Sequence, residues 1–69
     1  MNYYEIGQRI RKIRKAHGLS QEELAEKIGI STTHMSHIET GNTKLSLPVL
    51  VSIASVLEVQ TDDLLFEQA

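Results

Sequence analysis

Residues 20–41 read SQEELAEKIGISTTHMSHIETG, and this stretch decides the fold. Ser20 and Glu23 have capping-box spacing, in which each side chain satisfies a free backbone N–H of the other residue, so a helix is predicted to begin there. Gly29 suits the left-handed backbone conformation at the end of that helix. Ser31 is a good N-cap for a second helix that continues to the end of the stretch. The pattern therefore predicts two short helices separated by a tight turn.

The apolar residues of this stretch indicate how its two helices pack. They recur at helical spacing and are Leu24, Ala25, Ile28, Ile30, Met35 and Ile38. A small side chain is needed where two crossing helices come close, and Ala25 provides it. When Met35 and Ile38 face inward, four polar side chains of the second helix face outward together: Thr32, Thr33, Ser36 and His37. This is a helix-turn-helix arrangement, in which the second helix enters the major groove of DNA.

Three further helices are predicted from caps, breakers and apolar spacing. One runs over about residues 3–16, another begins at Ser46, and a short last helix is capped by Thr61. Strand signals are nearly absent. We therefore expect an all-α fold, a compact five-helix domain that spans residues 1–69 as a single unit, with the helix-turn-helix over about 20–40.

The composition excludes several classes of protein. A chain of 69 residues is one small domain. It has no cysteine, which excludes disulfides, thiolate metal sites and thiol catalysis. No apolar run approaches the roughly 18 residues that a membrane-spanning helix needs, and the N-terminus lacks the pattern of a signal peptide. We therefore expect a cytoplasmic protein that does not associate with membranes.

Charge is distributed unevenly along the chain. The formal net charge of −2 argues weakly against a nucleic-acid partner. However, five of the seven basic residues lie between Arg9 and Lys15, whereas residues 58–69 hold four acidic residues and no basic one. One end of the molecule can therefore face phosphates while the other faces away. Within the basic run we expect Arg14 to be structural and the other four residues to be solvated or to reach phosphates.

Three segments carry a resemblance to a known family: LSQEELAEKIGIS (19–31), MSHIETGNTKLS (35–46) and LVSIASVLEVQTDDLL (50–65). Together they resemble the Cro/CI-type helix-turn-helix family of bacterial and phage regulators, also described as lambda-repressor-like or XRE-like. The resemblance covers about residues 6–65. It implies a five-helix domain that binds duplex DNA sequence-specifically, usually as a two-fold dimer. We therefore expect a transcriptional regulator, a repressor or autoregulator, that acts as a homodimer on an inverted repeat.

The same resemblance implies roles for individual residues. Base contacts fall on the outer face of the recognition helix, at Thr32, Thr33, Ser36 and His37. Phosphate contacts fall on Gln21, Ser31, Thr40, Asn42 and Lys44. An ion pair between Arg14 and Glu39 is implied between the first and third helices, where it would set the angle of the recognition helix. Threonine methyl groups suit the thymine C5-methyl, and hydroxyls can donate or accept at base edges.

The sequence departs from the family pattern at three places. Leu45 stands where a proline is common, and Glu58 stands where a glycine usually ends the fourth helix, so that turn is expected to be strained. The base-reading face has no Arg, Gln or Asn, so specificity is expected to lean on methyl contacts, DNA shape and dimer spacing. Apolar residues beyond the needs of a small core predict the dimer interface at Val59, Leu64 and Phe66.

Alternative functions are judged by the same residues. The chain could keep the fold as a protein-interaction module or antitoxin-type partner, which the acidic net charge favours. Among regulators, a phage repressor, a restriction–modification controller and an antitoxin stay open. No nucleophile–base pair is evident, so we expect no enzyme and no small-molecule substrate. His34 and His37 have a spacing that suits a metal, but no third ligand is evident, so neither metal nor cofactor is expected.

Overall fold

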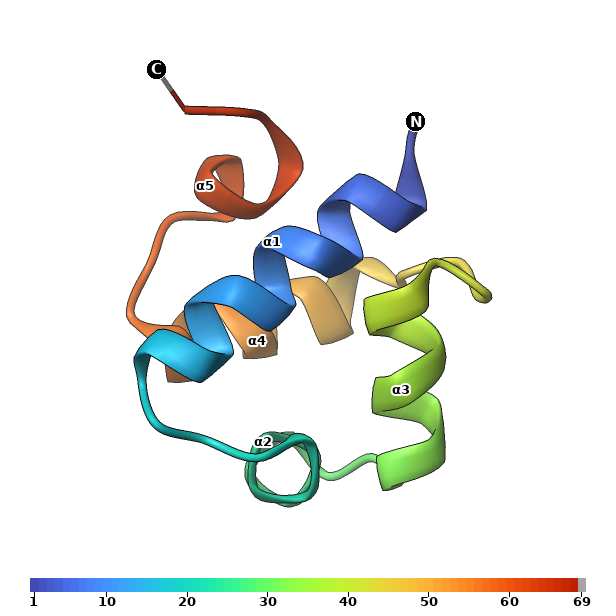
Figure 1. Ribbon diagram of the computed structural model, residues 1–69, viewed down its shortest axis with the longest axis vertical. Helices are drawn as coiled ribbons and strands as arrows, with labels where there is room; N and C mark the ends of the chain where they lie inside the picture. The colour runs from blue at the N-terminus through green and yellow to red at the C-terminus, as the bar shows by residue number, and fades with distance from the viewer. Residues whose placement is uncertain (69) are drawn as a thin grey trace.

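The protein is described by a computed structural model that covers residues 1–68. That part of the chain forms five helices and no strand: α1 (Tyr3–Ala16), α2 (Gln21–Ile28), α3 (Thr32–Thr40), α4 (Leu47–Leu57) and α5 (Thr61–Leu65). In Figure 1, α1 crosses the centre with α4 behind it, α2 is seen end-on, and α3 lies to one side. The predicted all-α, five-helix fold is confirmed. No helix within residues 1–68 is both long and apolar enough to cross a membrane.

Side-chain caps fix where most of the helices begin. The oxygens of Ser20, Ser31 and Ser46 each accept a hydrogen bond from the backbone N–H three residues on, at 3.0, 3.0 and 3.3 Å. At Ser20 the capping box is complete, because the Glu23 carboxylate accepts from the Ser20 N–H at 2.9 Å. Hydrogen bonding of the Glu23 carboxylate to Ser20, through the backbone N–H first and the side chain second, holds the pKa of Glu23 below its ordinary value of 4.5. The predicted starts of α2, α3 and α4 therefore match the structure.

The start of α5 differs from the prediction by one residue. Gln60, with an extended backbone at φ −76° and ψ 152°, is the N-cap, and Thr61 is already helical. The Asp63 carboxylate accepts a hydrogen bond from the Gln60 N–H at 2.9 Å. Threonine is a common cap residue, but here the acceptor comes from within the helix, so the chain turns one residue earlier.

All five helices contribute to one core. α1 packs against α3, α4 and α5, while α2 packs against α3 and α4. The buried apolar residues are Ile6, Ile10, Leu24, Ala25, Met35, Ile38, Leu50, Ile53, Ala54, Leu57 and Leu64. They include Ala25, Met35 and Ile38, which the sequence places inside. The helix-turn-helix is therefore held on α1 and α4 and not free-standing.

The turn after α4 is strained, as its sequence predicts. Glu58 has φ 57° and ψ 42°, and it is the sole non-glycine residue with positive φ within residues 1–68. The left-handed conformation brings the Cβ of such a residue close to a carbonyl oxygen, at a cost of roughly 1–2 kcal/mol. The Glu58 N–H still bonds the Ser55 carbonyl at 3.2 Å, so the helix ends in the usual way despite the strain.

Candidate nucleic-acid interface

The two sides of α3 differ in exposure. Met35, Ile38 and Glu39 are buried against the rest of the domain. On the opposite side, Thr32, Thr33 and His37 are exposed and Ser36 is half-buried. Positions spaced one, three and four residues apart share a face of a helix, so the structure brings the four predicted base readers together on one outward surface, here called the recognition face.

A buried carboxylate fixes the back of α3. Arg14 Nε lies 2.6 Å from Glu39 Oε2, and Arg14 Nη2 lies 3.0 Å from Glu39 Oε1, which makes a two-point ion pair. The side chains are only 7% and 1% exposed. Gln21 Nε2 donates to Glu39 Oε1 at 2.9 Å, and Arg14 Nη1 donates to the Leu19 carbonyl at 2.7 Å. The ion pair that the resemblance implies thus joins α1, α2 and α3 at one point.

The end of α3 also meets the backbone of α1. A Cβ on Gly7 would press on the Ile38 carbonyl oxygen and lie 2.6 Å from that of Glu39, so no larger residue fits without moving a helix. Gln8 Nε2 donates to the Glu39 carbonyl at 3.0 Å. That carbonyl belongs to the last turn of α3, where acceptors need partners from outside the helix. Sequence reasoning missed both residues, although an isolated glycine inside a helical pattern indicates close packing.

Gly41 completes this contact from the other side. It ends α3 with φ 75°, and a Cβ on it would lie 2.7 Å from the backbone nitrogen of Tyr4. Glycine is therefore required here for both its conformation and its size. With Gly7, it lets α1 and the last turn of α3 touch backbone to backbone, which fixes the position of the recognition face.

The residues predicted to contact phosphates differ in exposure and in the hydrogen bonds that they already make. Ser31 Oγ accepts from the His34 N–H at 3.0 Å, which leaves its hydroxyl hydrogen available to a phosphate. Asn42 and Lys44 are exposed in the segment after α3. Thr40 is exposed, but its hydroxyl donates to the Ser36 carbonyl at 2.9 Å, so its one hydrogen is already committed. Gln21 is half-buried on Glu39 and retains one amide hydrogen and its backbone N–H at the start of α2.

The basic run of α1 serves more than one purpose. Arg14 is structural, as expected. The expectation that Arg9 is solvated or reaches phosphates is wrong. Its Nη1 lies 3.3 Å from the carbonyl oxygens of both Leu64 and Leu65, at the end of α5. A cation there complements the negative end of the helix, so Arg9 fastens α5 to α1.

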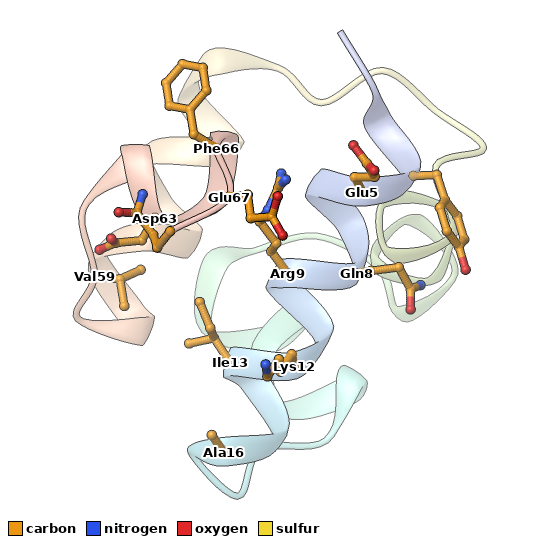
Figure 2. A pocket seen from close by; sticks show the side chains of 12 residues that line it. Glu5, Gln8, Arg9, Lys12, Ile13, Ala16, Val59, Asp63, Phe66 and Glu67 are labelled. Atoms are coloured by element: carbon orange, nitrogen blue, oxygen red, sulfur yellow. The ribbon is translucent and has the colours of Figure 1, made fainter.

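An open groove lies between α1 and residues 59–68, and two of the predicted dimer residues, Val59 and Phe66, line it. Figure 2 shows Val59 and Phe66 on one side of it and Arg9 and Ile13 on α1. Val59 is half-buried, and Phe66 is 58% exposed. The assignment of Leu64 to the interface is wrong, because its side chain is fully buried in the core of the single chain and offers no surface to a second subunit.

Comparison with known proteins gives the family. A family model described as helix-turn-helix (HTH_3) matches residues 10–64. The chain is 42% identical over 64 residues to the HTH-type transcriptional regulator SinR of Bacillus subtilis (strain 168), which covers 91% of this chain and 58% of that protein. It is 36% identical over 63 residues to the immunity repressor protein of Bacillus phage phi105, which covers 91% of this chain and 44% of the repressor. The chain therefore spans little more than half of SinR and less than half of the repressor.

Solved structures agree with this result. The structure of SinR in complex with DNA superposes with a TM-score of 0.82 at 42% identity, over 88% of this chain and 98% of that one. The restriction–modification controller protein C.AhdI from Aeromonas hydrophila superposes with a TM-score of 0.86 at 34% identity, over 90% and 94% of the two chains. These relatives are regulators and not enzymes, in agreement with the sequence analysis. The chain belongs to the Cro/CI-type helix-turn-helix family of transcriptional regulators.

Proposed function

We propose that this chain binds duplex DNA sequence-specifically, with α3 in the major groove, and regulates transcription as a repressor or autoregulator. The recognition face carries the proposal: it is outward and polar, while the opposite side of α3 is fixed by the buried Glu39 network. A reading helix needs this combination, because base contacts require a helix held at one depth and angle. The likeness to SinR in its complex with DNA supports the same function.

We further propose that the chain acts as a homodimer on an inverted repeat, in the cytoplasm. A two-fold pair of such domains would read half-sites about 34–36 Å apart. Phe66 and Val59 line the groove beside α5 and supply apolar surface for self-association. Between these two residues in the sequence is α5, which lies away from α3 in Figure 1, so a dimer formed there would leave the recognition face open.

Selection from a random duplex library at roughly physiological salt tests both statements, followed by the salt dependence of the enriched sequence. We expect an inverted repeat with half-sites about one helical turn apart. Enrichment of a single half-site would support sequence-specific DNA binding and contradict the proposed homodimer. Absence of any enriched duplex would remove sequence-specific binding.

Two variants separate base reading from phosphate binding. Thr33→Ala should change the preferred base at one half-site position, whereas Lys44→Ala should weaken binding to all sequences and lower the salt slope by about 1. Ser55→Ala, on the exposed side of α4, is the control and should change neither quantity. An unaltered base preference in Thr33→Ala would show that α3 is not the reading helix.

A second candidate is a protein-interaction module or antitoxin-type partner. It is favoured by the net charge of −2 and by a recognition face that has no lysine or arginine. A structure of SinR in a complex with the protein SinI has been solved, and this chain is 43% identical to the matched chain of that structure. A salt slope near zero, together with capture of a protein in place of DNA, would favour this candidate.

A further inference from the structure

We propose that the recognition face reads thymine methyl groups, so that each half-site carries T·A pairs where the first turn of α3 meets the base edges. Thr32 and Thr33 are the readers. The inference rests on the proposed function, because it names what the same face recognises.

The chemistry of the face leads to this choice. Thr32 and Thr33 are exposed at the first two positions of α3, and residues near the start of a recognition helix contact base edges. A threonine hydroxyl can pair with donors and acceptors alike, so it discriminates poorly among bases. The γ-methyl is different, because the thymine C5-methyl is the apolar group that a base presents in the major groove. Discrimination by these two residues therefore falls to methyl–methyl contact.

The other side chains of α3 include none that reads a base by paired hydrogen bonds. The helix sequence TTHMSHIET contains no Arg, Lys, Asn or Gln, the residues that read guanine or adenine by paired hydrogen bonds. Thr40 has turned its hydroxyl back onto the Ser36 carbonyl. Ser36 is half-buried, and His37 lies in the last turn of the helix. The first turn thus holds two of the three exposed threonines of this helix, and the third, Thr40, lies in its last turn.

Short side chains can contact base edges only from a helix that lies close to the bases and is held in one position. The γ-carbon of threonine lies only about 1.5 Å beyond Cβ, so its methyl reaches a base only if the helix backbone lies deep in the groove. A helix with long side chains is about 10–12 Å across and already fills a major groove about 12 Å wide. In the first turn of α3, Thr32 and Thr33 make this side of the helix thinner, which permits the deeper position there.

The contacts between α3 and the neighbouring helices α1 and α2 provide the fixed position. Contact between carbon atoms is favourable only near about 3.5–4.0 Å, so a small shift of the helix would remove it. The backbone contact at Gly7 and the bonds of Arg14 and Gln21 to Glu39 leave α3 little freedom to shift. Threonine is also branched at Cβ and stiff, so ordering it costs little entropy.

The test is a double-substitution cycle on the selected operator. Each thymine of the half-site is replaced by deoxyuridine, which removes only the C5-methyl. At the positions facing Thr32 or Thr33, we expect binding to weaken about fourfold per half-site, as for loss of one buried methyl. In Thr33→Ser, which keeps the hydroxyl and lacks the methyl, deoxyuridine at the cognate position should have no further effect.

Two further variants sharpen the result. Thr33→Val keeps the methyl and lacks the hydroxyl, so its sensitivity to deoxyuridine should persist. Thr61→Ser, which makes the same change at the first position of α5, should leave the sensitivity of the wild type unchanged. Placing 5-methylcytosine where cytosine has weakened binding should recover part of the affinity, because it restores the methyl in the same groove.

The outcomes distinguish this inference from the proposed function. Specific binding to an operator that is insensitive to deoxyuridine at every position overturns methyl reading and leaves sequence-specific regulation standing. Methyl reading by these residues is also overturned if Thr33→Ser and Thr32→Ser both remain as sensitive to deoxyuridine as the wild type. Failure to enrich any duplex overturns both proposals.

Discussion

Removing one partner of the Arg14–Glu39 ion pair should destabilise the domain far more than removing both. Arg14→Met leaves the Glu39 carboxylate, at 1% side-chain exposure, with Gln21 as its one hydrogen-bond donor. Glu39→Leu leaves a guanidinium at 7% exposure with the Leu19 carbonyl as its one remaining acceptor. In either variant a buried charge has lost its counter-charge, which water cannot replace at such low exposure.

The magnitude follows from burial. Breaking a buried pair from one side costs about 3–5 kcal/mol, while replacing both partners by apolar residues of similar volume is often neutral. A domain of this size has a total unfolding free energy of roughly 3–10 kcal/mol. Each single variant should therefore lose about 3 kcal/mol, equivalent to a fall in Tm of about 15–20 °C, and come close to unfolding. The double variant Arg14→Met/Glu39→Leu should recover most of that loss.

Urea unfolding followed by circular dichroism gives the free energies of the wild type, both single variants and the double variant. Lys15→Met, an exposed neighbour of Arg14, is the control and should lie within about 0.5 kcal/mol of the wild type. The reasoning is refuted if each single variant loses under about 1 kcal/mol, or if the double variant loses the sum of the two.

Three other predictions concern different parts of the molecule. Glu58→Gly should raise the unfolding free energy by about 1 kcal/mol, because glycine accepts φ 57° without strain, and Glu58→Ala should gain less in the same urea titration because the strain remains. The unfolding free energy of Glu23→Gln should approach that of the wild type as pH falls. Because the pKa of Glu23 is lowered in the folded state, the carboxylate stabilises the fold above the unfolded-state pKa, and this stabilisation is lost as pH falls through the folded-state pKa. A difference in unfolding free energy that stays constant from about pH 7 to pH 3 would contradict this prediction. Phe66→Ala should weaken self-association about tenfold or more in sedimentation, given the apolar area involved, and a dimer of unchanged affinity would remove Phe66 from the interface.

Local rules are sufficient to locate most of the helices. The caps at Ser20, Ser31 and Ser46 and the left-handed glycines depend on residues within a few positions of each other, so the sequence predicts them directly. α5 shows where such rules become ambiguous: Gln60 and Thr61 both precede acidic residues, and the acceptor on Asp63 decides between them.

The parts of the site that sequence reasoning misses depend on contacts between distant residues. Gln8 bonds the Glu39 carbonyl across 31 positions, and Arg9 reaches the end of α5 across 55 and 56 positions. Spacing along α1 shows neither, because each partner is a backbone carbonyl whose location is set by packing. The assignment of Leu64 to the dimer interface fails for a related reason, since one turn of helix has too few residues to show from spacing alone which apolar side chains remain exposed.

The division of α3 into a held side and a free side makes the domain suitable for exchanging its specificity. The side chains that hold the helix are Met35, Ile38 and Glu39, and none of them lies among the outward residues. A combinatorial library at Thr32, Thr33, Ser36 and His37 would therefore sample new operator preferences at little cost in stability. A library at Gly7 would instead sample whether the chain folds at all, because any side chain there meets the backbone of α3. One helix thus separates what the protein recognises from what keeps it folded, and the two can be varied independently.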